Sequence, residues 1–126
     1  MNILVVEDEP DVAEVLRRAL EQLGNRCVLA ADAEQAERAL GQDAFDAVTL
    51  DLSMPGRGGL EWLEGVARSR PDLARKTLII TGIQLCAESV SRLTRCGAGV
   101  LAKPFTIEHL IDAVRCQLDR GSQGRD

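Results

Sequence analysis

The sequence contains no tyrosine, and its 126 residues include only two phenylalanines and one tryptophan. Proteins that bind single-stranded nucleic acids stack bases on such rings. Positive charge is also scarce, because 15 basic residues stand against 20 acidic ones and the formal net charge is −5. Binding to a nucleic-acid backbone depends on clustered lysine and arginine, and the sequence has no such cluster. We therefore expect this chain to bind neither DNA nor RNA.

Long apolar runs are missing as well. No segment approaches the roughly 20 apolar residues of a membrane-spanning helix, and "NILVVEDEP" after Met1 lacks the basic start and long apolar stretch of a signal peptide. We expect a cytoplasmic protein that does not contact membranes. A length of 126 residues with 45% hydrophobic content supports one domain with one core.

The cysteines form no C-x-x-C pair, and a single histidine is present to help them bind zinc. This spacing argues against a metal site or a disulfide framework, so we expect reduced and mostly buried thiols. The histidine lies between acidic residues on the expected outer side of the last helix, which indicates a solvated position. The four cysteines are Cys27, Cys86, Cys96 and Cys116, and the histidine is His109.

Short apolar runs alternate with segments whose apolar residues recur at helical spacing. The runs predict strands, and Pro71 is expected to close the third helix, with a solvated loop over 68–76 and Trp62 at the edge of the core. Asp32 and Gln35 have the spacing of a capping box at the second helix. The expected strands are 3–6, 27–30, 47–52, 77–81 and 100–102, and the expected helices are 12–23, 33–40, 60–70, 86–96 and 107–118.

Continuous apolar strands separated by helices predict an α/β fold with a five-stranded parallel sheet, covered by helices on both faces. Such sheets bind their ligands at the carboxyl ends of the strands. The run "VTLDL" carries a carboxylate at this point with no basic neighbour in sequence, and other polar residues follow the remaining strands. The residues expected at this edge are Glu7, Asp8, Asp51, Thr81 and Lys103.

Three carboxylates in one place raise each other's pKa unless a cation compensates them. Mg²⁺ prefers oxygen ligands and often binds a phosphate together with one or two carboxylates. A phosphoryl group drawn to such a site would be accepted by Asp51, with Thr81 and Lys103 binding its oxygens. Only two of the 15 basic residues are lysines, so a lysine at this edge indicates a need for a compact, mobile charge.

Four motifs in order, "ILVVEDEP", "VTLDLSMPGRGGLEWL", "LIITG" and "LAKPF", resemble those of the receiver domain of bacterial two-component response regulators. The resemblance covers about residues 2–119, and we expect a receiver domain over 1–119. It implies a doubly wound (βα)5 fold with the flavodoxin-like strand order 2-1-3-4-5. Residues 120–126 are expected to form a disordered polar tail. The implied site residues are Asp51 as phosphoacceptor, Asp8 as direct Mg²⁺ ligand, Glu7 as ligand through water, the backbone carbonyl of Ser53 as ligand, and Thr81 and Lys103 as phosphate contacts.

The implied partners are a histidine kinase or a phosphotransfer protein as phosphoryl donor, and a downstream effector protein or fused domain. Val100 stands where many receivers carry the aromatic ring of their switch. The segment "GAGVLAKPF" is one residue shorter than usual, and with "TG" at 81–82 it is similar to receivers fused to hybrid histidine kinases.

Two other functions remain open at this stage. A degenerate receiver would act only as a protein-interaction module, and the intact set of acidic, hydroxyl and lysine residues argues against it. An aspartyl-phosphate phosphatase of the haloacid-dehalogenase type needs a second aspartate two residues after the first. Here that position is Ser53, which argues against such an enzyme.

Overall fold

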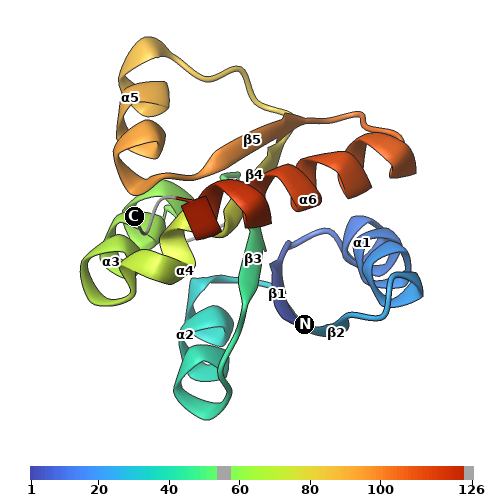
Figure 1. The fold of residues 1–126 in the computed structure, drawn as a ribbon. Coiled ribbons are helices and arrows are strands. Elements are labelled where there is room, and N and C mark those ends of the chain that lie inside the picture. The colour runs from blue at the N-terminus through green and yellow to red at the C-terminus, as the bar shows by residue number, and fades with distance from the viewer. Residues whose placement is uncertain (54–57, 124–126) are drawn as a thin grey trace.

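The computed structural model describes residues 1–53 and 58–123. Its strands form one parallel sheet in the order β2-β1-β3-β4-β5, which confirms the predicted architecture and strand order (Figure 1). Residues 54–57 of the motif "VTLDLSMPGRGGLEWL" lie outside the described residues. The strands are β1 (Asn2–Val6), β2 (Arg26–Ala30), β3 (Ala47–Leu50), β4 (Thr77–Thr81) and β5 (Gly99–Ala102).

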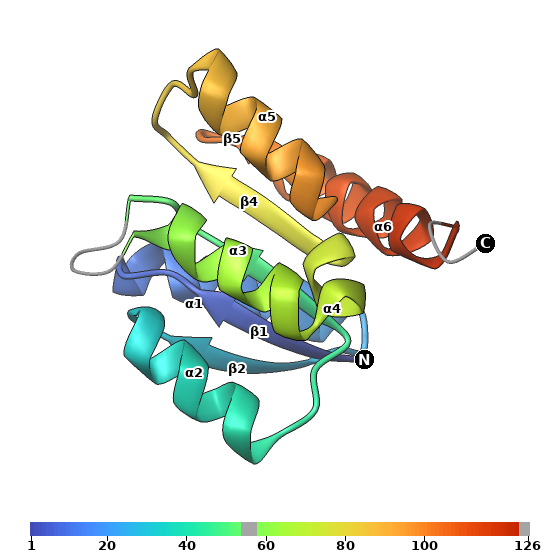
Figure 2. The same ribbon diagram turned by 90° about the vertical axis from the view of Figure 1, so that its left-hand side faces the viewer.

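Helices cover both faces of this sheet (Figures 1 and 2). One face packs against α1 and α6, and the other packs against α2, α3, α4 and α5. The helices are α1 (Pro10–Gln22), α2 (Ala33–Gln42), α3 (Gly59–Ser69), α4 (Pro71–Arg75), α5 (Ala87–Cys96) and α6 (Ile107–Gln123).

The first strand shows why its sequence is apolar without interruption. Leu4 and Val6 belong to the core on the side of α2 and α3, whereas Ile3 and Val5 belong to the core under α1 and α6. Successive side chains of a strand point to opposite faces, and here both faces are buried.

The predicted capping box at the start of α2 is confirmed. The side chain of Asp32 accepts a hydrogen bond from the Gln35 N–H at 2.8 Å, and the Gln35 side chain accepts one from the Ala31 N–H at 2.9 Å. The first bond satisfies an N–H group that the first turn of α2 leaves free, and the second ties that turn to the residue before the N-cap. After α1, Gly24 takes a φ of 88°, a conformation that glycine adopts without strain.

The segment 68–76 is not the solvated loop that the sequence predicts. Pro71 does end α3, but it also begins the short helix α4, because its fixed φ suits the first position of a helix. Leu73 and Ala74 of this helix are buried in the core. The prediction for Trp62 is wrong as well, because its side chain lies fully within the core and not at the edge.

The thiols are free, as predicted, but they are not mostly buried. Cys86 and Cys116 are exposed, Cys27 is half-buried, and only Cys96 belongs to the core. His109 is exposed, as its sequence position predicts.

Helix α6 extends to Gln123, so residues 120–123 are helical and do not belong to a disordered tail. Residues 124–126 lie outside the described part, and the domain boundary at residue 119 stays a prediction. Within the described residues no helix has the length and apolar character needed to span a bilayer.

A buried glutamine joins three helices at the edge of the sheet that lies away from the predicted site. The Gln117 side chain on α6 donates hydrogen bonds to the Arg75 carbonyl at 2.6 Å and to the Gly97 carbonyl at 2.8 Å. Arg75 is the last residue of α4 and Gly97 caps α5. Gln117 is only 3% exposed, so these carbonyls have little access to replacement water.

We predict that Gln117→Ala lowers the free energy of unfolding by about 2–4 kcal/mol, because a buried acceptor left unsatisfied costs roughly 1–3 kcal/mol. Urea unfolding followed by circular dichroism measures this change. Gln22→Ala is the matched control, since Gln22 is exposed at the end of α1, and it should stay within about 0.5 kcal/mol of the parent. Equal decreases in the free energy of unfolding of the two variants would show that the buried Gln117 bonds do not stabilise the fold.

Candidate functional site

The predicted site residues lie at the carboxyl ends of β1, β3, β4 and β5, and Thr81 is the last residue of β4. Glu7 and Asp8 come directly after β1, and Asp51 comes directly after the neighbouring β3, where its N–H donates to the Val6 carbonyl at 3.0 Å. Lys103 follows β5. Figure 2 shows the arrowheads of the strands on the side of the molecule away from the two termini.

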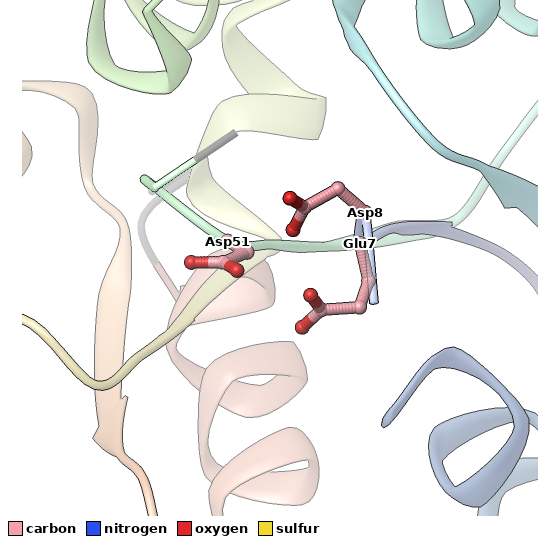
Figure 3. Close-up of side chains that lie close together, drawn as sticks. All are labelled: Glu7, Asp8 and Asp51. Carbon is pink, nitrogen blue, oxygen red and sulfur yellow. The ribbon is translucent and has the colours of Figure 1, made fainter. Parts of the chain in front are cut away.

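The three carboxylates lie together, as the sequence predicts. Glu7, Asp8 and Asp51 each offer an oxygen, and these oxygens all lie within 4.8 Å of one another. In Figure 3 the side chains of Glu7 and Asp8 extend from the end of β1 toward Asp51. Glu7 is 3% exposed and Asp51 is 2% exposed, whereas Asp8 is half-buried. The site therefore consists of two buried carboxylates, Glu7 and Asp51, and a third, Asp8, that is nearer to solvent.

Lys103 supplies the positive charge that is missing from the sequence neighbourhood of Asp51. Its Nζ atom lies 2.9 Å from Glu7 Oε1 and 3.3 Å from Asp51 Oδ2. Burial lowers the pKa of Lys103, but the hydrogen bond to Glu7 and the charges of both carboxylates outweigh it and raise the pKa above its usual value. One ammonium thus bridges two carboxylates that are 44 residues apart in the sequence.

Asp51 is held in its ionised form by donors close to it in sequence. Its Oδ1 atom accepts hydrogen bonds from the Ser53 N–H at 3.0 Å and from the Ser53 hydroxyl at 2.8 Å. Burial alone would raise the pKa of Asp51. The Ser53 donors, the Glu7 carboxyl and the charge of Lys103 together outweigh burial, so the pKa falls below its ordinary value. This carboxylate is therefore available as a nucleophile at neutral pH.

Glu7 has the opposite balance. Its pKa is raised to about 7, mainly by burial and also by the charge of Asp51, although hydrogen bonds from Lys103 and from the Glu9 N–H lower it. A carboxyl whose pKa is raised by burial and by a like charge indicates negative charge that Lys103 compensates only in part.

Thr81 lies at the end of β4, beside β5, the strand that Lys103 directly follows. Its backbone carbonyl accepts the Lys103 N–H at 2.9 Å, and its buried hydroxyl oxygen accepts the Ile83 N–H at 3.3 Å. Among the described residues, Thr81 is not joined to the carboxylates by a side-chain hydrogen bond. Val100 lies on β5 with 49% of its surface exposed.

The oxygen atoms available as metal ligands at this site fit a hard divalent cation. They are carboxylate oxygens, which Mg²⁺ prefers, and Asp8 makes no ion pair with any residue that the structure describes. Burial and the charge of Asp51 raise the pKa of Glu7, so its ionised form is costly without a nearby positive charge.

Two features of the site were not predicted from the sequence. The direct contact of Glu7 with Lys103 was not expected, and binding of a metal by Glu7 through water stays a prediction. The side chain of Ser53 was given no function, yet it donates to Asp51. A serine two residues after an aspartate is able to form such a local bond, so the spacing could have indicated it.

Comparison with known proteins identifies the family. The sequence model of the response regulator receiver domain matches residues 3–115 of the chain. The chain belongs to this family, whose members are the receiver domains of two-component signalling.

The relatives include regulators of known name. The response regulator MprA of Mycolicibacterium vanbaalenii is 36% identical over 120 residues, which cover 95% of this chain and 51% of that protein. The transcriptional activator protein PfeR of Pseudomonas aeruginosa is 32% identical over 124 residues, which cover 94% of this chain and 40% of that protein. This chain therefore spans about half the length of the curated relatives that it matches.

Solved structures agree with the fold. A CheY-like receiver domain protein from Methanospirillum hungatei superposes with a TM-score of 0.87 at 24% identity, covering 98% of this chain and 97% of that one. The response regulator TrrA of Thermotoga maritima, solved in complex with Mg²⁺ and BeF, has a TM-score of 0.78 at 29% identity and covers 92% and 97% of the two chains.

We predict that Glu7→Gln stabilises the metal-free protein at pH 8 and not at pH 4. The folded state raises the pKa of Glu7 from 4.5 to about 7, so it binds a proton that the unfolded state releases. The stability from this proton is fully present below pH 4.5 and is lost as the pH rises through about 7. Glutamine resembles the neutral form of Glu7 at every pH. At pH 8 the free energy of unfolding of the variant should therefore exceed that of the parent by on the order of 3 kcal/mol at most.

Chemical denaturation in EDTA at the two pH values measures this difference. Glu9→Gln, at an exposed position two residues away, is the control and should show the same effect on stability at both pH values. A Glu7→Gln effect that does not change with pH would refute the prediction.

Proposed function

We propose that this receiver domain accepts a phosphoryl group on Asp51 from the phosphohistidine of a histidine kinase or a phosphotransfer protein, with Mg²⁺ as cofactor. The observation that carries this proposal is the environment of Asp51. The carboxylate is 2% exposed, its pKa is lowered, and it lies within 4.8 Å of two further carboxylates. Such a nucleophile beside a cation site suits phosphoryl transfer.

Each residue has a distinct task in this proposal. Asp8, Asp51 and the Ser53 carbonyl would hold Mg²⁺, and Glu7 would bind it through water. When bound, the ion would neutralise charge on the phosphoryl oxygens. Asp51 would attack the phosphorus, and the donor imidazole would leave with the electron pair of the broken bond. Lys103 would then bind a phosphoryl oxygen with its Nζ atom, and Thr81 would donate its hydroxyl to another.

We further propose that the phosphorylated domain acts through an effector protein or a fused domain, and that it is not an enzyme with an external substrate. The chain spans about half of its curated relatives, and two of these are a response regulator and a transcriptional activator. Residence in the cytoplasm fits this exchange with a kinase. The similarity to receivers of hybrid kinases stays a prediction.

We expect acetyl phosphate to label the protein only when Mg²⁺ is present, and Asp51→Asn to abolish the labelling. An amide is neither a nucleophile nor an anionic ligand, so both functions of the side chain are lost. Intact-mass spectrometry measures the added phosphoryl group. Asp112→Asn is the control, because Asp112 is exposed on α6 outside the site, and it should label like the parent.

The outcome also separates the alternatives. Stable stoichiometric labelling supports the receiver function, continuous release of phosphate over many turnovers would indicate a phosphatase, and no labelling of the parent would indicate a degenerate receiver. Full labelling of Asp51→Asn at another residue would refute the acceptor assignment.

The exposed Val100 predicts a limited spread of the signal. A valine is stiff at its first torsion and buries much less area than an aromatic ring, so its reorientation moves little surface. With Mg²⁺ and beryllofluoride, amide resonances near Asp51, Thr81 and Lys103 should shift strongly, and those of residues 107–119 weakly. Val100→Tyr should extend the shifts into α6. Large shifts along α6 in the parent would contradict this prediction.

A further inference from the structure

The strand β2 forms one edge of the sheet, and among the described strands it pairs only with β1 (Figure 2). The N–H of Arg26 and the C=O of Ala30, at the two ends of β2, bond to backbone at the two ends of β1, at 2.8 Å and 2.9 Å. Because a strand directs the backbone groups of alternate residues to the same side, those of Val28 face β1 as well. The N–H and C=O groups of Cys27 and Leu29 therefore point away from the sheet.

This open stretch of backbone is bounded on both sides. The Asn25 N–H donates to a carbonyl of α1 at 3.2 Å, and the Ala31 N–H donates to the side chain of Gln35 at 2.9 Å. Along the described edge, Cys27 and Leu29 are therefore the residues whose N–H and C=O groups are both available to another strand.

The edge carries little of the usual protection against strand addition. Edge strands are commonly protected by charged side chains, by proline or by a bulge. The register of β2 with β1 is continuous, the strand contains no proline, and Arg26 at its start is its only charged residue. Leu29 is 42% exposed and Cys27 is half-buried. An apolar edge with open backbone groups is suited to pairing with an added strand.

We propose that β2 pairs with β2 of a second copy of this chain, in antiparallel orientation around a two-fold axis at Val28. In this register Cys27 lies opposite Leu29 of the second copy, and the two-fold axis repeats the pair. Each pair exchanges two backbone hydrogen bonds, so the open groups of both strands are satisfied. A register centred on either of these residues would instead use Asn25 or Ala31, whose N–H groups are already bound.

Charge complementarity favours a second copy as the occupant of this edge. Asp32 has extended backbone, and it lies on the same face as Arg26 because alternate side chains share a face. In the proposed register Arg26 lies diagonally across from Asp32 of the second copy, within reach of a long side chain. Arg26 makes no ion pair with any residue that the structure describes. The Oδ1 atom of Asp32 caps α2, so its Oδ2 atom is left for the guanidinium.

Both faces of the joined sheet gain side-chain contacts. Cys27 and Leu29 share the face that packs against α1, so each leucine covers a cysteine of the second copy. Val28 lies on the opposite face and meets Val28 of the second copy. The contact involves few residues, so its area lies below the about 1,200–2,000 Å² of stable complexes and we expect weak association.

Disulfide trapping tests the register. In a chain with Cys27→Ala, Cys86→Ser and Cys116→Ser, the change Val28→Cys places two thiols opposite each other at the two-fold axis, within the roughly 4.4–6.8 Å Cα separation of a disulfide. Arg26→Cys is the matched control, because this position is more exposed but lies far from its own copy in the proposed register. Non-reducing electrophoresis under mild oxidation should show dimers of Val28→Cys forming about ten-fold faster or more, since pairing raises the effective concentration.

Sedimentation equilibrium of the whole chain measures the association without a covalent bond. The parent should dimerise increasingly between about 10 µM and about 1 mM. Leu29→Lys places a charge on the edge and should raise the dissociation constant about ten-fold or more. Val90→Lys is the control, since Val90 is 47% exposed on α5 and lies outside the proposed interface, and it should associate like the parent. Thermal melts check that the variants are folded.

The outcomes separate this interface from others. A parent that stays monomeric over the whole range would overturn the proposal. So would association that Leu29→Lys leaves unchanged or that Val90→Lys removes, because the copies would then meet through another surface. Equal trapping of Val28→Cys and Arg26→Cys would overturn the register. The proteins are measured without Mg²⁺ or a phosphoryl donor, so the result does not depend on the proposed phosphorylation of Asp51.

Discussion

The bridge from Lys103 to Glu7 and Asp51 is the interaction on which the site depends. Two carboxylates with almost no exposed surface are costly unless they are paired. The Nζ atom of Lys103 contacts both of them, at 2.9 Å and 3.3 Å, and Asp8 adds a third carboxylate within 4.8 Å. One positive charge among three acidic groups leaves the site with an excess of negative charge. That excess makes the same residues suitable for holding a cation.

The sheet makes this arrangement possible at low cost in conformational freedom. The acidic residues follow the neighbouring strands β1 and β3, and backbone bonds fix their spacing, such as the Asp51 N–H to the Val6 carbonyl at 3.0 Å. Helix α3 packs closely behind the acceptor, because a Cβ atom at Gly59 would lie 3.1 Å from the Asp51 carbonyl oxygen. Packing and backbone hydrogen bonds therefore fix the backbone that carries the acidic side chains.

Much of this arrangement could be predicted from the sequence, because parallel strands are apolar on both faces and their carboxyl ends meet at one edge. The strand Thr77–Thr81 has the bounds that its apolar run predicts. Helix α4 was missed because a proline that ends one helix can also begin another. The Gln117 bonds and the direct contact of Lys103 with Glu7 were not predicted, because the topology brings segments together but side-chain packing decides which atoms pair.

On the proposed function, a phosphoryl group at Asp51 changes the partners of Lys103 without a change in the sheet. The strands β4 and β5 are locked in register, and the Lys103 N–H remains bound to the Thr81 carbonyl. The response must therefore begin in side chains and in the segment after Thr81, which leads to α5. Only Leu93 and Cys96 of that helix are buried, although Arg92 also forms a two-point ion pair with Glu64 of α3. So little burial means that a change in the position of α5 disturbs few core contacts.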